Sequence, residues 1–334
     1  MGEADEVLEQ ATDWLESGKT VAMATVIGTW GSSPRPVGSQ LAVDGDGAFV
    51  GSVSGGCIEG AVVGEALQSI EDGKPRTLEF GVTNEQAWEV GLACGGDIKV
   101  LVEKEADREM LERLISDRPV ATVTDIETGE RSLVRPGGVE GGLALPDGVV
   151  SEVRQALRSD VSRVIEDGGR NLFVRVFNTP LRMVCVGAVH IAQSLVPMAA
   201  LAGFDVTVVD PRGSFATVDR FPEVSLNDEW PDDAMDEIKP DGRTAIVTLT
   251  HDPKLDDPAL DRALKSDAFY IGALGSKRTH AARVERLREA GFTDGDIDRI
   301  HAPIGLDIGS KSPSEIAVSI LSEIVAAKHG KTGV

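Results

Sequence analysis

The stretch that decides the fold of the second half of this chain is Val184-Cys185-Val186-Gly187-Ala188-Val189-His190-Ile191-Ala192. An apolar run ends at a glycine and a helical pattern starts at once, as in the strand, tight turn and helix that open a Rossmann-like sheet. Strand patterns and helical patterns then alternate at 182–186, 191–201, 205–209, 244–250 and 268–271. This alternation predicts a doubly wound parallel sheet.

The turn after the first of these strands departs from the dinucleotide fingerprint G-x-G-x-x-G, because the middle glycine is replaced by Val189. That glycine normally lets the backbone approach a pyrophosphate, so a side chain there weakens standard dinucleotide binding. Asp210 nevertheless stands where a ribose-binding carboxylate is expected, and His190 lies at the helix head, either as a ligand contact or as a cap of the sheet edge. Gly187, His190 and Asp210 are therefore candidate nucleotide-binding residues, and an NAD(P)-dependent oxidoreductase is an alternative function.

Polar side chains follow two later strands, in the segments 250–254 and 272–278. In an open parallel sheet, ligands bind beyond the carboxyl ends of the strands. We therefore expect these segments to border the ligand crevice, together with residues 305–311.

The first half of the chain carries a cysteine at a predicted helix start, in Ser52-Val53-Ser54-Gly55-Gly56-Cys57-Ile58-Glu59. The positive end of a helix dipole favours the thiolate, which attacks electrophiles or binds soft metals. Gly55 and Gly56 would let a bulky ligand approach and would point their N–H groups at an anion such as a phosphate. The alternative is a tight turn in which Cys57 is a small buried apolar residue.

Two other irregular segments carry candidate binding residues. Cys94-Gly95-Gly96 repeats the composition of the first cysteine motif, so the two loops could face one pocket, although a plain glycine turn is equally open. The loop Gly31-Ser32-Ser33-Pro34-Arg35 follows the first strand, and Arg35, its one cation, suits a carboxylate or a phosphate. A solvated arginine is the alternative there.

The length of 334 residues and the hydrophobic fraction of 41% predict two packed domains. In the first, a helical pattern over 7–15 precedes a strand over 21–27 and a hairpin around Asp44-Gly45-Asp46-Gly47, which favours an α+β domain. Residues 119–176 predict short strands, turns and a helix near 150–157, with no motif that indicates chemistry. We place the boundary at the turn Asn178-Thr179-Pro180, giving domains 1–178 and 179–334.

The composition excludes several classes of protein. A formal charge of −22 repels phosphate backbones and anionic lipid, so we expect neither nucleic acid nor a membrane as partner. No basic leader and no run of about 18 apolar residues is present, so we expect a cytoplasmic protein. Three cysteines and five histidines, all of the latter in the C-terminal half, argue against a disulfide framework and against a structural zinc site.

Taken together, these segments resemble the XdhC/CoxI family, the accessory factors of xanthine dehydrogenase and carbon monoxide dehydrogenase. The resemblance covers nearly the whole chain. Its residues are Gly31-Ser32-Ser33-Pro34-Arg35, Gly55-Gly56-Cys57-Ile58-Glu59, Cys94-Gly95-Gly96, Asp210-Pro211-Arg212, Ile271-Gly272-Ala273-Leu274-Gly275-Ser276 and Ile304-Gly305-Leu306-Asp307-Ile308-Gly309.

The resemblance implies a chaperone without turnover of its own. Such a protein binds molybdenum cofactor (molybdopterin), protects it while a cysteine desulfurase installs the terminal sulfur, and inserts it into an apo molybdenum hydroxylase. Cys57 would be the cofactor-binding cysteine and the ligand of the metal. Many family members have G-A-G-H where this chain has Gly187-Ala188-Val189-His190, so a nucleotide in the Rossmann-like domain stays open. A pure scaffold for hydroxylase and desulfurase is a third alternative, and a homodimer is one of the oligomeric states left open.

Overall fold

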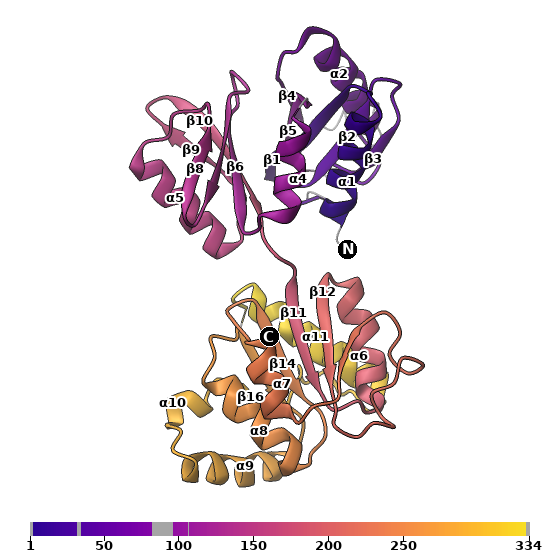
Figure 1. The fold of residues 1–334 in the computed structure, drawn as a ribbon, viewed down its shortest axis with the longest axis vertical. Coiled ribbons are helices and arrows are strands. Elements are labelled where there is room, and N and C mark those ends of the chain that lie inside the picture. The colour runs from indigo at the N-terminus through magenta and orange to yellow at the C-terminus, as the bar shows by residue number, and fades with distance from the viewer. Residues whose placement is uncertain (1–2, 32–34, 82–95, 106, 332–334) are drawn as a thin grey trace. The chain divides into compact units, whose positions relative to one another are not determined.

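The computed structural model describes residues 3–31, 35–81, 96–105 and 107–331 (Figure 1). The chain divides into two compact units, Met1–Thr179 and Pro180–Val334, next to the expected boundary. Each unit is described by itself.

The second unit contains a six-stranded parallel sheet. Its strands run in the order β13-β12-β11-β14-β15-β16, so the order reverses between β11 and β14, as in the doubly wound fold predicted from the sequence. The strands are β11 (Leu181–Val186), β12 (Phe204–Val209), β13 (Ser225–Asn227), β14 (Thr244–Thr248), β15 (Tyr270–Ala273) and β16 (Ile300–His301).

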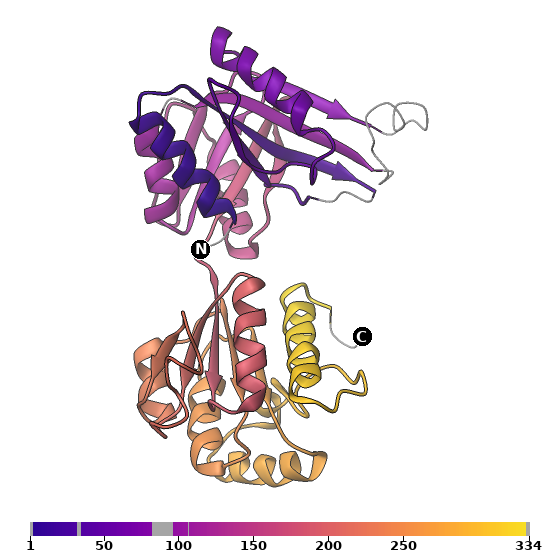
Figure 2. The same cartoon turned by 90° about the vertical axis from the view of Figure 1, so that its right-hand side faces the viewer.

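Helices cover both faces of this sheet (Figure 2). The core on one face contains residues of α6 (His190–Leu201) and α11 (Pro313–Lys328). The core on the other face contains residues of α7 (Pro231–Ile238), α8 (Pro253–Leu264), α9 (Lys277–Glu289) and α10 (Asp294–Ile297). A capping box opens α11: Ser312 accepts the N–H of Glu315, and the Glu315 carboxylate accepts the N–H of Ser312.

The first unit contains two antiparallel sheets of five strands each. The first sheet has the order β3-β2-β1-β5-β4. Its strands are β1 (Val21–Trp30), β2 (Gln40–Asp44), β3 (Phe49–Gly51), β4 (Arg76–Phe80) and β5 (Asp97–Glu105). Helix α2 (Glu59–Asp72) packs on one face of this sheet, and α1 (Glu3–Glu16) packs on the other.

The second sheet repeats the topology of the first. Its order is β8-β7-β6-β10-β9. When the strands of each sheet are numbered along the chain, both sheets have the order third, second, first, fifth, fourth. In both, a helix lies between the third and fourth strands in the sequence. The elements are α4 (Arg108–Ser116), β6 (Val120–Asp125), β7 (Arg131–Arg135), β8 (Gly138–Gly141), α5 (Asp147–Ser159), β9 (Arg163–Asp167) and β10 (Arg170–Phe177). The connections differ: 81–96 joins the last two strands of the first sheet, and only Gly168-Gly169 joins those of the second.

The two sheets share an apolar core. Leu8 of α1, Met23 of β1 and Leu111 of α4 pack in one buried cluster with Leu133 of β7 and Phe177 of β10. The first unit is therefore one folded body with an interior between its sheets, in which α1 and α4 are neighbours.

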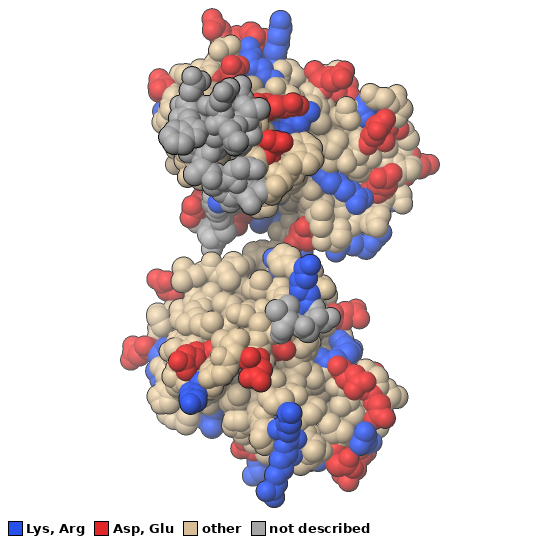
Figure 3. Space-filling model, turned by 180° about the vertical axis from the view of Figure 1, so that it is seen from behind, with Lys and Arg blue, Asp and Glu red and all other residues tan. Residues whose placement is uncertain are grey.

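Two further features are the distribution of charge on the surface and the length and hydrophobicity of the helices. Figure 3 shows acidic and basic side chains interspersed over one face of the molecule, so on that face the excess of carboxylates is spread and not gathered in a single patch. Within the described ranges, no helix combines the length and the hydrophobicity that crossing a membrane would need.

Candidate functional site

The cysteine and arginine motifs of the first unit leave the same end of its first sheet, which we call the loop end. Thr25 of β1 pairs with Gln40, so the connection from β1 to β2 lies beyond that pair. Gly51 pairs with Leu41, so the segment that carries Cys57 leaves β3 at the same end (Figure 2). Phe80 pairs with Ile98 there as well, at the connection from β4 to β5.

Four of the predicted site residues, Ser32, Ser33, Cys94 and Gly95, lie outside the described residues. Gly96 directly precedes β5, at the loop end. Whether Cys94 acts together with Cys57 therefore stays a prediction.

A buried carboxylate holds the segment that carries Cys57. Glu59, the first residue of α2, is 6% exposed, and its Oε1 accepts the hydroxyl of Ser52 at 2.7 Å and the N–H of Ser54 at 2.9 Å. Its Oε2 accepts the hydroxyl of Ser54 at 2.5 Å and the N–H of Gly56 at 2.9 Å. Burial alone would raise the pKa of Glu59, but these hydrogen bonds lower it from 4.5 to about 2.

The backbone of this segment is hydrogen-bonded within itself, which differs from the expectation that its N–H groups face an anion. Gly55 donates to Ser52 Oγ at 2.8 Å, and Gly56 donates to Glu59. Cys57 and Ile58 both donate to Ser54 Oγ, at 3.0 and 3.1 Å. The glycines instead supply positive φ angles, +80° at Gly55 and +114° at Gly56, that let the chain wrap around the Glu59 carboxylate.

Cys57 lies two residues before the start of α2, partly exposed, and packs on the edge of the core between α2 and the first sheet. Its side chain is thus fixed on one side by apolar contacts and accessible on the other. Among the histidines, cysteines and carboxylates that the structure describes, no group of three or more could hold a metal ion.

We expect Glu59→Gln to destabilise the chain by about 2 to 3 kcal/mol at pH 7, because the anion accepts five hydrogen bonds, one of them from the N–H of Val53, that an amide cannot all accept. The folded pKa is lowered, so this stabilisation is complete above about pH 4.5 and is lost as pH falls toward 2. Urea denaturation at pH 7 and pH 3 measures it: the difference between wild type and variant should shrink at pH 3. Glu71→Gln, on the exposed side of α2, is the control, and an equal loss there would contradict the assignment.

Arg35 lies in a basic pocket of about 180 Å³ at the loop end. The pocket also contains Ser39 from the same connection, Gln40 at the start of β2, and Arg175 from β10 of the second sheet. Arg175 was not predicted from the sequence, although a single arginine in the otherwise apolar run Leu172–Phe177 was a usable sign. Ser52 N donates to Gln40 O at 3.0 Å, so the pocket borders the segment that carries Cys57.

In the second unit, Gly187 and Asp210 come together at the turn between β11 and α6. Gly187 N donates to Val209 O at 2.9 Å, and Ala188 N donates to Asp210 Oδ2 at 2.8 Å. Asp210 is fully buried, and Arg212 donates to both of its oxygens, at 2.8 and 2.7 Å. Burial opposes these bonds, but together they lower the pKa of Asp210.

This arrangement uses the Asp210 carboxylate to hold the turn. In a dinucleotide site the equivalent carboxylate accepts ribose hydroxyls, and here both oxygens already accept bonds from the protein. His190 is exposed at the start of α6, with its Nδ1 3.1 Å from Gln193 Oε1. Cys185, by contrast, is fully buried in β11, and burial raises the pKa of its thiol to about 12, as expected of a core residue.

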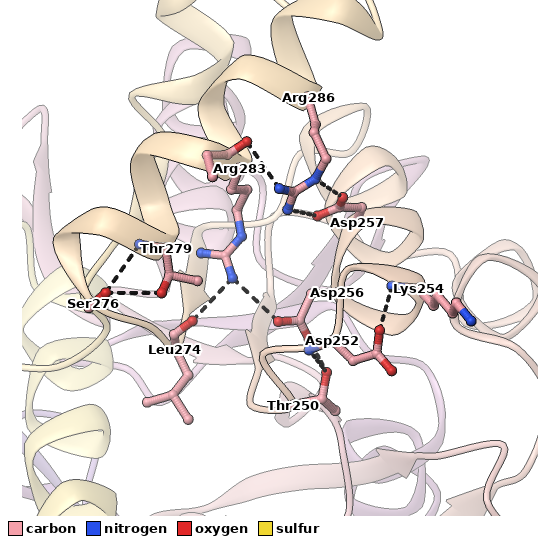
Figure 4. Close-up of polar contacts among 11 residues, drawn as sticks. Thr250, Asp252, Lys254, Asp256, Asp257, Leu274, Ser276, Thr279, Arg283 and Arg286 are labelled. Atoms are coloured by element: carbon pink, nitrogen blue, oxygen red, sulfur yellow. Dashed lines mark hydrogen bonds and ion pairs between the residues drawn. The ribbon is translucent and has the colours of Figure 1, made fainter.

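The segments after β14 and β15 meet through a buried ion pair (Figure 4). Arg283 of α9 is 2% exposed, and its Nη2 lies 3.3 Å from Asp256 Oδ2 and donates to Leu274 O at 3.1 Å. Thr250 donates to the other oxygen of Asp256 at 2.6 Å. The polar residues that the sequence places beyond these two strands are therefore tied together at one edge of the sheet.

Known proteins similar to this chain share both units. Residues 183–324 match the family described as XdhC Rossmann domain, and residues 14–81 match the XdhC and CoxI family. The molybdenum cofactor insertion chaperone PaoD of Escherichia coli (strain K12) is 28% identical over 328 residues, covering 96% of this chain and 88% of the relative. A probable subunit of xanthine dehydrogenase from Bacillus subtilis (strain 168) is 27% identical over 324 residues, covering 94% and 95%.

A crystal structure of a xanthine dehydrogenase from Bacillus halodurans superimposes with a TM-score of 0.78 at 25% identity, covering 99% of this chain and 97% of that one. The two family matches fall one in each unit, and each contains a motif that carries the resemblance read from the sequence, Cys57 with its glycine pair in the first and Asp210-Pro211-Arg212 in the second. The chain therefore belongs to the XdhC and CoxI family.

Proposed function

We propose that this chain is an accessory protein that binds molybdenum cofactor at the loop end of its first unit and inserts it into a partner molybdenum hydroxylase. The observation that carries the proposal is Cys57: a partly exposed thiol on a segment that the buried Glu59 holds in one conformation. A thiolate is a suitable ligand for a soft metal centre, and a ligand held in place before binding loses little freedom on binding. The name of the relative PaoD supports the same role.

The finer steps rest on the resemblance. The cofactor stays bound while a cysteine desulfurase installs its terminal sulfur, and a hydroxylase of the xanthine dehydrogenase or carbon monoxide dehydrogenase type then receives it. Gly55 and Gly56 shape the segment, and Cys57 binds the metal. The N–H groups of this segment already have acceptors, so an anionic group of the cargo needs cations from another part of the site.

The test is cofactor analysis of the purified full chain after incubation with molybdenum cofactor released from a molybdenum enzyme. We expect close to one molybdenum and one pterin per chain after gel filtration, measured by elemental analysis and by pterin fluorescence. NADH titrated under the same conditions should give no saturable fluorescence change in the micromolar range, because both Asp210 oxygens are occupied.

Two results would contradict the proposal. Absence of both molybdenum and pterin would remove the chaperone role. Micromolar NADH binding without pterin would favour the NAD(P)-dependent oxidoreductase.

A further inference from the structure

The pocket between the two sheets of the first unit has the composition of an anion site. Its described lining consists of Ala4 and Val7 of α1, residues 35–40, and Arg175. No carboxylate is among these residues, although the chain has 55 Asp and Glu against 33 Lys and Arg. Two guanidinium groups therefore share a hollow from which, within the described lining, acidic side chains are absent.

Arg175 is held in place without a carboxylate partner. Its Nη1 donates to Val176 O at 3.0 Å and to Ser162 Oγ at 3.4 Å, and the guanidinium lies 4.7 Å from the centre of the Phe177 ring. None of the ion pairs between described residues includes it, and its Nε is buried without a hydrogen-bond acceptor. Burial lowers the pKa of Arg175 to about 10, still far above neutrality, so the group is a cation in the folded chain.

The strand places this cation where an apolar side chain is expected. Residues alternate along β10, and Phe173 and Phe177, two positions to either side of Arg175, pack in the cores that face the first sheet. A cation at such a position lowers stability unless an anion compensates it. The charge of Asp160 favours the cation, but none of the ion pairs between described residues includes Arg175.

The backbone opposite is built to receive the guanidinium. Gly38 has a φ of +92°, and a Cβ there would lie 2.8 Å from Arg175 Nη1. Gly38 N donates to Val26 O at 2.7 Å and Val26 N donates to Ser39 O at 2.9 Å, which fixes this connection on β1. Gln40 donates to Thr25 Oγ1 at 3.2 Å, and its own Oε1 is buried without a donor. The pocket thus offers cations and one hydrogen-bond acceptor.

We infer that this pocket, between Arg35 on the connection from β1 to β2 and Arg175 on β10, is a binding site for a phosphate monoester. Guanidinium groups bind phosphate oxygens through charge-assisted, often bidentate hydrogen bonds. The volume of about 180 Å³ is several times the ~30 Å³ of one water molecule in the liquid, enough for a phosphate group and the start of its ester chain. A phosphate that keeps one proton can donate it to Gln40 Oε1.

Two molecules could supply the phosphate group: a pterin cofactor bound at Cys57, or a separate phosphate ester. Cys57 packs on the face of the first sheet that α2 covers, and the pocket lies on the opposite face. The two places are connected at the edge strand β3, where the N–H of Ser52 donates to Gln40 O. The first source rests on the proposed function, and the phosphate site itself does not.

The first arm of the test measures inorganic phosphate binding by the full chain at constant ionic strength, from the rise in thermal unfolding temperature. We expect a saturable rise for wild type and a dissociation constant at least about tenfold higher for Arg175→Met. Arg170→Met is the matched control, because it removes one positive charge at the opposite end of β10, where Arg170 pairs with Asp167. Without phosphate, Arg175→Met should be at least as stable as wild type, since it removes a buried cation that has no ion-pair partner among the described residues.

No rise for wild type up to about 50 mM phosphate, or equal rises for wild type and Arg175→Met, would overturn the inference. If circular dichroism shows that Arg175→Met is unfolded, Arg35→Met replaces it in the same comparison, because Arg35 lies on a connection outside both sheets. The second arm measures pterin retention. Retention lost in Arg175→Met assigns the pocket to the cofactor phosphate, and unchanged retention with lost phosphate binding assigns it to a separate ester. Phosphate binding without any pterin would refute the proposed function and leave the site standing.

Discussion

Replacing Cys57 by serine should reduce the molybdenum retained by the purified chain at least about tenfold, from near stoichiometry to a trace. The substitution exchanges a sulfur ligand, which suits a soft metal centre, for a hydroxyl, which binds such a metal poorly. The measurement is molybdenum and pterin per chain after incubation with released cofactor and gel filtration.

The fold should not change with this substitution. The backbone N–H groups of Cys57 and Ile58 donate to Ser54 Oγ, and those of Gly55 and Gly56 donate to Ser52 and Glu59, so none of these bonds uses the thiol. Cys185→Ala is the control, because that thiol is fully buried in β11 of the other unit. If Cys57→Ser keeps its molybdenum, the metal is held elsewhere and the central assignment of this site is wrong.

The largest effect on stability should come from Gly187→Ala, a loss of about 3 kcal/mol or more in the second unit. Gly187 has a φ of +105°, where an L-residue is strained, and an added Cβ would lie 2.4 Å from Thr250 Cγ2. Neither strand end can retreat easily, because Gly187 N is bonded to Val209 O and Thr250 is bonded to Asp256.

A second substitution separates the two causes. Thr250→Ser removes Cγ2 but keeps the hydroxyl that donates to Asp256, so Gly187→Ala with Thr250→Ser should recover the steric part of the loss and keep the backbone part. Hydrogen exchange of peptides from β11 and β14 under increasing urea reports on this unit alone. If Gly187→Ala alone is as stable as wild type, then neither the positive φ angle nor the contact with Thr250 constrains this turn.

The second unit could be predicted from the sequence because its information is local. Each strand ends at a turn that leads directly into a helix, as at Gly187, and the parallel order follows from that alternation. The short elements were missed: β13 has three residues and β16 two, too few for a pattern to show. The sequence predicted where Asp210 lies but not what it binds, because no pattern reveals that Arg212 donates to both of its carboxylate oxygens.

The first unit was predicted less completely because its information is distant in sequence. The hairpin at Asp44-Gly45-Asp46-Gly47 is local and was found, whereas β1 pairs with β5, a strand that lies far from it in the sequence. Cys57 was singled out from its glycines, but the carboxylate that accepts the N–H of Gly56 was not, because no pattern distinguishes Glu59 from an ordinary first residue of a helix. Arg175 belongs to a strand whose neighbours only the folded chain defines.

The repeated strand order of the first unit suggests its history and a use for it. Two sheets of one topology in one body are what a duplication would leave, with a longer connection in the copy that we propose to bind the cofactor and a two-residue turn in the other. The copy with the short turn therefore shows, within the same chain, which connections this topology needs in order to fold. Replacing residues 81–96 by a turn like Gly168-Gly169 would test whether the longer connection is needed for binding the cofactor or for folding.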